Sequence, residues 1–130
     1  MRSVHVAAAA FLALAAAAPA AHAATDRPEQ PSHLFLTVSG AEDTWVHGVR
    51  LNCTPHPSGH HPYAAEACEA LDAADGDLDA LLVEQRICTQ EYAPVTVLAT
   101  GTYRGEPVDW RKTFGNACAM DASTGHVFRF

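Results

Sequence analysis

The alternation of apolar and polar positions predicts two β-strands in the first half of the chain. Leu34 to Val38 is an apolar run that ends at Ser39-Gly40, residues that are typical of turns. Gly48 to Cys53 alternates apolar and polar residues, as a strand with one buried face does. Because only a polar connection separates the two strands, we expect them to pair as neighbours.

A β-hairpin is the clearest element of the second half. Val95 to Tyr103 is rich in β-branched residues, Arg104 to Pro107 has the composition of a turn, and Val108 to Phe114 forms the returning strand. The returning strand is amphipathic. One of its faces carries Val108, Trp110 and Phe114, and the other carries Asp109, Arg111 and Thr113.

Helical periodicity follows Pro62, a residue suited to the first turn of a helix. We expect this main helix to end near Gly76 and Asp77 to cap a short helical turn after it. The buried stripe of the main helix has the spacing i, i+3, i+4 and i+7. It consists of Ala64, Ala67, Cys68 and Leu71, and the short turn carries Leu78, Leu81 and Leu82.

The remaining segments have no periodic pattern. Thr54 to Pro62 contains three prolines and a glycine, so we expect no regular structure there. We also expect Gly115 to Gly125 to be irregular, and Val127 to Phe130 to form a short terminal strand or a tail that fills the core. The predicted fold class is therefore α+β, an antiparallel sheet of about five strands with one main helix and a short helix packed on one face.

The first residues have the pattern of an export signal. Arg2 gives a basic start, Val4 to Pro19 is almost entirely apolar, and Ala21-His22-Ala23 is a small-x-small cleavage site. We predict that residues 1–23 are a signal peptide cleaved near Ala23-Ala24 and that the protein is secreted. Residues 24–32 are predicted to be a flexible tail, and residues 33–130 to form one domain.

Composition narrows the class of partner. The formal net charge is −7 at pH 7, so nucleic acids and anionic membrane surfaces would repel the chain. No segment after the signal has the run of about 18 apolar residues that crosses a membrane.

Neither a glycine-rich phosphate loop nor a Gly-x-Ser-x-Gly or His-Glu-x-x-His motif occurs. We therefore predict no cofactor and no enzymatic activity.

The four cysteines, Cys53, Cys68, Cys88 and Cys118, all follow the signal. In a small exported domain they predict two disulfides, and the sequence alone leaves three pairings open. A zinc site is the rival interpretation, but no C-x-x-C pair occurs. Three histidines of the proline-rich loop, His56, His60 and His61, are interpreted as solvated side chains and not as metal ligands.

The segment Arg86 to Pro94 has neither helical nor strand periodicity. It contains a half-cystine, Cys88, near its start and leads through Pro94 into the strand predicted at Val95. Such a segment is either an ordinary surface connection or a backbone that is held out toward a partner protein. Its own residues do not decide between the two.

Several separate motifs occur in one order along the chain. They are the cysteine framework, Pro57 to Pro62, Asp77 to Leu81, Cys88 to Pro94, and Asn116 to Met120 followed by Val127 to Phe130. Together they resemble the Streptomyces subtilisin inhibitor family of secreted serine protease inhibitors. The resemblance extends from about Leu34 to the C-terminus.

The resemblance implies a disulfide pairing and an oligomeric state. The pairs would be Cys53 with Cys68 and Cys88 with Cys118. Their loops of roughly 15 and 30 residues would stabilise the fold by about 3 and 3.6 kcal/mol in the chain-entropy model. Family members are homodimers that stack sheet faces, and we expect the faces of Val95 to Thr102 and Val108 to Phe114 to be apolar enough for this contact.

The resemblance also implies a reactive bond for a subtilisin-like serine protease. The residue two positions after the third cysteine, Gln90, would enter the primary specificity pocket, so the bond offered is Gln90-Glu91. Asn116 resembles the supporting asparagine of the family, and we expect its side chain to hydrogen-bond the backbone near Gln90. The expected contact residues beside the bond are Ile87, Cys88, Thr89 and Tyr92.

Two positions depart from the commonest family pattern. Thr89 stands where proline is frequent, and Gln90-Glu91 replaces a methionine or basic residue followed by an apolar one. Gln90 has no cation for the buried aspartate of a trypsin-like pocket, so we expect subtilisin-like targets instead. Two alternatives stay open: Gln90 as a glutamine donor for a secreted transglutaminase, or a metalloprotease bound by another face.

Overall fold

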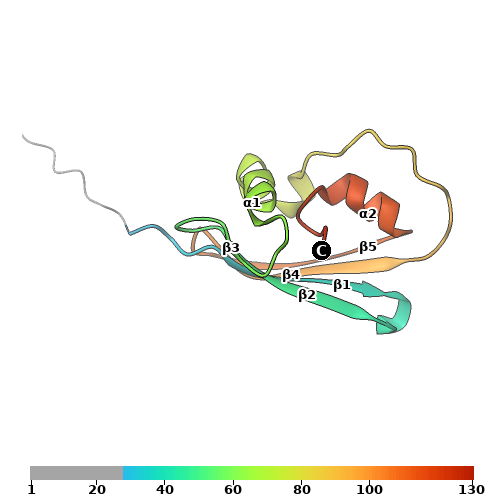
Figure 1. Cartoon of the computed structure of the whole chain (residues 1–130), viewed down its shortest axis with the longest axis horizontal. Helices are drawn as coiled ribbons and strands as arrows, with labels where there is room; N and C mark the ends of the chain where they lie inside the picture. The colour runs from blue at the N-terminus through green and yellow to red at the C-terminus, as the bar shows by residue number, and fades with distance from the viewer. Residues whose placement is uncertain (1–27) are drawn as a thin grey trace, which may run out of the picture.

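The computed structural model describes residues 28–130, which contain one five-stranded sheet (Figure 1). The strand order is β3-β2-β1-β4-β5, and every neighbouring pair is antiparallel. The predicted signal peptide and the first part of the predicted tail, residues 24–27, lie outside the described residues. The strands are β1 (His33–Gly40), β2 (Val46–Asn52), β3 (Ser58–Gly59), β4 (Val95–Tyr103) and β5 (Glu106–Phe114).

Two helices, α1 (Ala64–Ala73) and α2 (Ala117–Thr124), lie on the same side of the sheet (Figure 1). Single 3-10 turns, η1 (Ala41–Asp43) and η2 (Leu78–Ala80), lie in the connections. The predicted α+β class is confirmed, with the hairpin β4–β5 and the main helix at the expected positions. The expected cap of η2 is also present, because the side chain of Asp77 accepts a hydrogen bond from the amide of Asp79 at 2.9 Å.

The core lies between the sheet and the helices. Alternate residues of the central strands β1 and β4 point into it, as period-2 patterning requires. The apolar face of β5 packs against the same core. The buried residues include Leu34, Leu36, Val38, Val95, Val97 and Ala99 from the strands, and Ala67, Cys68 and Leu71 from the stripe of α1.

The C-terminal residues fill this core as a tail and form no strand. Val127 and Phe128 are fully buried, and the ring of Phe128 stacks on that of Trp110 with centroids 5.8 Å apart. Of the two alternatives for Val127 to Phe130, the structure has the core-filling tail. Leu82, in contrast, does not belong to the buried turn after α1, because it is 82% exposed.

The proline-rich segment is not wholly irregular, contrary to the prediction. Ser58 and Gly59 form β3, which pairs with the end of β2. Gly59 has a φ of 105°, and a Cβ there would lie 2.3 Å from the main-chain oxygen of Arg50. Only glycine fits this position. Gly59 was expected to interrupt regular structure, but it permits a short pairing at the edge of the sheet.

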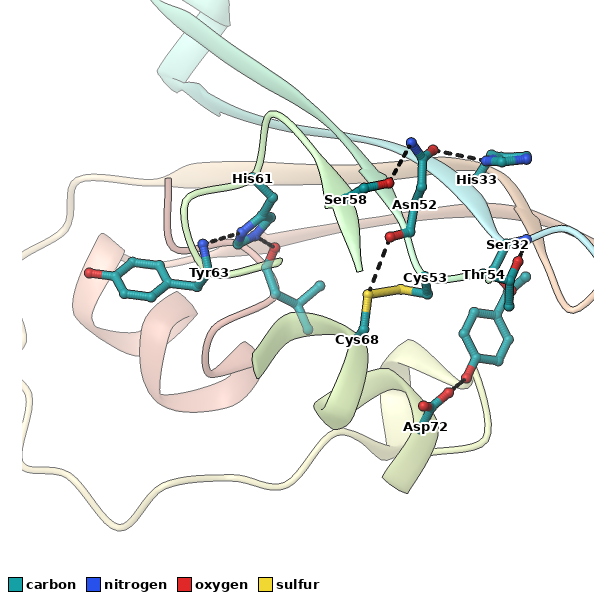
Figure 2. The surroundings of a disulfide bond; sticks show 12 residues. Ser32, His33, Asn52, Cys53, Thr54, Ser58, His61, Tyr63, Cys68 and Asp72 are labelled. Carbon is teal, nitrogen blue, oxygen red and sulfur yellow. Dashed lines mark hydrogen bonds between the residues drawn. A yellow bond between two sulfur atoms is a disulfide. The ribbon is translucent and has the colours of Figure 1, made fainter. Parts of the chain in front are cut away.

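The disulfide Cys53–Cys68 joins the end of β2 to α1 (Figure 2). Beside it, the side chain of Asn52 links three strands. Its oxygen lies 2.8 Å from Nδ1 of His33, and its amide nitrogen donates to the hydroxyl of Ser58 at 3.3 Å. The disulfide thereby fixes this end of the sheet to the helix layer, and the polar contacts of Asn52 hold the three strands together.

The interpretation of His61 as a solvated side chain is wrong. His61 is buried, its Nδ1 accepts from the amide of Tyr63 at 2.9 Å, and its Nε2 lies 2.9 Å from the main-chain oxygen of Val127 (Figure 2). These two contacts require the neutral tautomer with the proton on Nε2. Burial lowers the pKa of His61 and outweighs the opposing effect of the carbonyl contacts. The C-terminal tail, distant in sequence, is what buries this ring.

The end of the predicted tail is also part of the domain. Ser32 is buried, its amide donates to the hydroxyl of Thr54 at 2.9 Å, and its own hydroxyl accepts from the amide of Arg104 at 2.8 Å. The amide of Gly105 donates to Pro31 O at 2.9 Å. The ordered contacts therefore begin before residue 33, the boundary that we expected.

Within residues 28–130, no helix is both long and apolar enough to span a bilayer. Over the same range, histidine, cysteine and acidic side chains do not gather in any group of three or more that could hold a metal ion.

Candidate functional site

The connection from η2 to β4 is a long arch that passes around α2 (Figure 1). Residues 82–94, here called the exposed loop, contain no helix or strand. The side chains of Ile87 and Tyr92 are 101% and 83% exposed, and Gln90 and Glu91 between them are also exposed. The loop thus offers a continuous stretch of backbone and side chains to a partner.

The second disulfide fixes this loop just before Gln90. Cys88 is joined to Cys118 of α2, with their Cα atoms 5.7 Å apart. On the other side of Gln90, the amide of Ala93 donates to the main-chain oxygen of Gly115 at 2.9 Å. The backbone is therefore held at two points that flank the bond between Gln90 and Glu91.

Asn116 contacts the loop on both sides of that bond. Its Nδ2 donates to the main-chain oxygens of Thr89 at 3.1 Å and of Glu91 at 2.9 Å. Its Oδ1 accepts from the amide of Ala119 at 2.9 Å and so caps α2. One side-chain amide thereby fixes both the loop and the helix that carries the loop.

The prediction that Gly115 to Gly125 is irregular is wrong, because the eight residues Ala117–Thr124 form helix α2. Asparagine at the N-cap and Gly125 just beyond the last helical residue were the signals that could have found it. The helix contributes three of the contacts that hold the loop, namely the Cys88–Cys118 disulfide, the N-cap Asn116, and Ala122 O, which accepts from the amide of Glu84 at 2.8 Å.

A cluster of four charges holds the start of the loop, and we call it the ion cluster. It consists of Glu84 and Arg86 from the loop, Asp121 from α2 and Arg129 from the C-terminal tail. The guanidinium of Arg86 contacts both carboxylates, and that of Arg129 donates to the two oxygens of Asp121 at 2.8 and 3.0 Å. Partial burial alone would raise the pKa of Asp121, but hydrogen bonds from Arg129 and Arg86 outweigh it and lower this pKa.

A groove separates the loop from the β1–β2 connection. Thr89, Glu91 and Pro94 line one side of it, and Trp45 lines the other. Because most residues of the loop are exposed, its position depends on α2 and the disulfide more than on apolar burial.

These features define a class of protein. It is a small α+β domain with two disulfides that presents an exposed segment already held in place. The groups that hold the segment are a disulfide, main-chain hydrogen bonds, an asparagine and ion pairs. A segment ordered in advance loses little conformational entropy when a partner binds it.

Comparison with known proteins assigns the family. The model of the subtilisin inhibitor-like family matches residues 30–116. A subtilase-type protease inhibitor of Streptomyces fradiae is 42% identical over 116 residues, which is 85% of this chain and 82% of that protein. A subtilase-type protease inhibitor of Streptomyces coelicolor is 44% identical over 105 residues, which is 77% of this chain and 73% of that protein.

A solved structure agrees with these relatives. Streptomyces caespitosus sermetstatin, crystallised in complex with Bacillus licheniformis subtilisin, superposes with a TM-score of 0.64 at 36% identity, covering 77% of this chain and 99% of that one. The chain belongs to the subtilisin inhibitor-like family. It is thus placed among protease inhibitors and not among enzymes.

Proposed function

We propose that the exposed loop inhibits subtilisin-like serine proteases as a substrate that is released very slowly, with Gln90-Glu91 as the reactive bond. The observation that carries this proposal is the double contact of Asn116 with the main-chain oxygens of Thr89 and Glu91. It supports a bond held on both sides by one rigid group. The relatives named above support the class of target.

The chemistry belongs to the protease. Its serine hydroxyl adds to the carbonyl carbon of Gln90, its oxyanion hole stabilises the tetrahedral intermediate, and its histidine passes the serine proton to the departing nitrogen. The bond to Glu91 breaks, which leaves an ester between Gln90 and the serine and a free amine on Glu91.

The inhibitor supplies the geometry that reverses this step. Cys88–Cys118 keeps the acyl side attached to α2, and the contacts of Glu91 with Asn116 and of Ala93 with Gly115 keep the amine side in place. The amine then attacks the ester at a high effective concentration, so religation competes with hydrolysis. The complex persists because the products do not separate.

Specificity would depend on Gln90 and Ile87, both of which are exposed. A long uncharged side chain is tolerated by the broad pocket of a subtilisin-like protease, whereas it leaves the buried aspartate of a trypsin-like pocket unpaired. Ile87, three residues earlier, offers an apolar side chain to a neighbouring hydrophobic subsite. Titration of subtilisin and of trypsin with the mature protein tests this ranking, and equally tight inhibition of both would contradict it.

We further propose that the protein is exported and forms a homodimer. Two disulfides within the described residues suit an oxidising compartment.

For the dimer, the sheet face opposite the helices exposes Phe35 and Val46 by 46% and 56%, and the ring of Phe35 lies over Gly48. The expectation that β5 contributes an apolar face was wrong, because Val108, Trp110 and Phe114 pack on the core. The apolar outer surface therefore comes from β1, β2 and β4.

A second candidate function is that of a glutamine donor for a transglutaminase, which the exposure of Gln90 on a segment without helix or strand favours. Gln90→Asn separates the two functions, because shortening the side chain should abolish amine incorporation at this site but only alter the strength of protease inhibition. Binding of a metalloprotease by another face stays an alternative without a specific contact to support it.

A further inference from the structure

The inhibitory cycle proposed above assigns no role to the ion cluster, although the cluster is one of the supports of the exposed loop. Glu84 and Arg86 are both loop residues, so their 2.6 Å ion pair is local, and the other ion pair of Glu84, at 3.8 Å, reaches Arg129 of the tail and not α2. Asp121 is different, because it lies on α2 and contacts Arg86 directly. Within the cluster, the contact of Arg86 with Asp121 is the direct side-chain link from the loop to the helix.

Asp121 is itself held by the core. Arg129 donates to both of its carboxylate oxygens, and Arg129 follows Phe128, which is fully buried against Trp110. A chain of contacts therefore runs from the core through the tail to Asp121 and on to Arg86. The side chain of Asp121 is 20% exposed and that of Arg129 30% exposed, so solvent and salt screen this pair less than they screen ion pairs on the open surface.

A second point of attachment matters for the geometry of the cut bond. The disulfide at Cys88 and the bond from Asn116 to Thr89 O hold the residues next to the reactive bond, but they do not hold the residues before Cys88. Arg86 lies two residues before Cys88, and its contact with Asp121 adds an anchor on the same helix, close to the contact of Glu84 with Ala122. Two anchors fix a direction as well as a position, and religation requires both.

We propose that Asp121 is a positioning residue of the inhibitory cycle, which acts through Arg86 to keep the loop before the reactive bond seated on α2 while the protease holds the cut ends. This inference rests on the function proposed above. It assigns to Asp121 an effect on how long the complex lasts, not on how fast the protease first binds.

The test compares wild type, Asp121→Asn, Arg86→Gln and the double variant, each mixed with subtilisin. The rate of cleavage at Gln90-Glu91 within the saturated complex and the association rate constant are measured separately. We expect Asp121→Asn and Arg86→Gln each to speed cleavage by about three- to tenfold with an unchanged association rate, and the double variant to be no faster than the quicker single variant.

Asp72→Asn is the matched control. Asp72 is a carboxylate on α1 that also contacts two partners, Tyr103 and Arg104, but it lies away from the loop. It should lower thermal stability without speeding cleavage. Independent, multiplicative effects of Asp121→Asn and Arg86→Gln, or equal acceleration by Asp72→Asn, would overturn the proposal.

A measurement on the free protein keeps this inference separate from the proposed function. Amide hydrogen exchange in Asp121→Asn should rise at residues 84 to 90 and stay unchanged in β1 and β4. If wild type fails to inhibit subtilisin yet this local increase occurs, the proposed function is wrong and the positioning by Asp121 stands. Unchanged exchange in the loop would refute the positioning itself.

Discussion

The side-chain amide of Asn116 donates a hydrogen bond to the main-chain oxygen of Glu91 at 2.9 Å. Its other donated bond reaches Thr89 O, and its oxygen caps α2. Aspartate at this position keeps the oxygen that caps the helix but has no N–H to donate, so it separates the two roles of the residue.

We therefore predict that Asn116→Asp speeds hydrolysis of the reactive bond by about tenfold or more, because two carbonyl oxygens lose their donor and face a carboxylate. The melting temperature should change little, since an aspartate is as good an N-cap as an asparagine. Asn116→Ala should speed hydrolysis similarly and also destabilise the fold by about 1 kcal/mol. If Asn116→Asp is hydrolysed as slowly as the wild type, the hydrogen bonds of Asn116 do not protect the reactive bond.

The side chain of residue 90 should decide the class of target. We predict that Gln90→Lys gains tight inhibition of trypsin, because the ammonium pairs with the aspartate of the trypsin pocket. Gln90→Met serves as the control, since it keeps the length without a charge and should inhibit subtilisin but not trypsin. Inhibition constants for both proteases provide the measurement, and a Gln90→Lys variant that is still inert toward trypsin contradicts the assignment of the reactive bond.

The two disulfides should have different effects on function. Replacing Cys88 and Cys118 by serine should lower stability by about 3.6 kcal/mol at most and turn the inhibitor into a substrate that is cut and released. Replacing Cys53 and Cys68 should lower stability by a similar amount, about 3 kcal/mol, and leave the lifetime of the complex intact at temperatures where the variant is folded. Equal loss of inhibition in both pairs would mean that stability, and not the local anchor, sets the lifetime.

His61 should make the fold sensitive to mild acid. Its pKa is lowered by burial below the ordinary value of 6.5, so the unfolded chain binds a proton more readily than the folded one. Its contribution to stability is therefore fully present above pH 6.5 and is lost as the pH falls below that value toward the lowered pKa. Urea unfolding at pH 7.5 and pH 5 should show this loss in wild type and in the exposed-site control His60→Gln, and much less of it in His61→Gln.

The dimer proposal depends on the outer face of the sheet. Leu98 of β4 lies on that face beside Thr37, its partner in β1. Leu98→Glu should place a charge in the contact and shift the protein to monomers, as measured by sedimentation at several concentrations. Val83→Glu, a charge at an exposed apolar position of the loop, should leave the oligomeric state unchanged. A wild type that sediments as a monomer at every concentration contradicts the proposal.

Local sequence signals were sufficient for most of the sheet and for α1. Strand patterning with period 2 and an apolar stripe at helical spacing depend only on neighbouring residues, and both marked the elements that the structure contains. Helix α2 was missed because its residues, mostly small, give it no strong apolar stripe, and it is defined by its end residues Asn116 and Gly125.

The supports of the loop were harder to predict for a different reason. Glu84, Arg86, Asp121 and Arg129 come from three separate segments, and only the folded chain brings them into one cluster. The burial of His61 could not be predicted for the same reason, because Val127, which accepts its hydrogen bond, is 66 positions away. A sequence pattern reports local structure, whereas these contacts are determined by how the segments pack.

The central claim is that the loop is cut slowly and reversibly at one bond. Its most direct test is to mix the mature protein with a small molar amount of subtilisin, let the mixture approach equilibrium, and determine masses before and after reduction of the disulfides. The account predicts one added water in part of the unreduced protein and, after reduction, two fragments divided between Gln90 and Glu91. Rapid and complete cleavage, or cleavage at another bond, would contradict it.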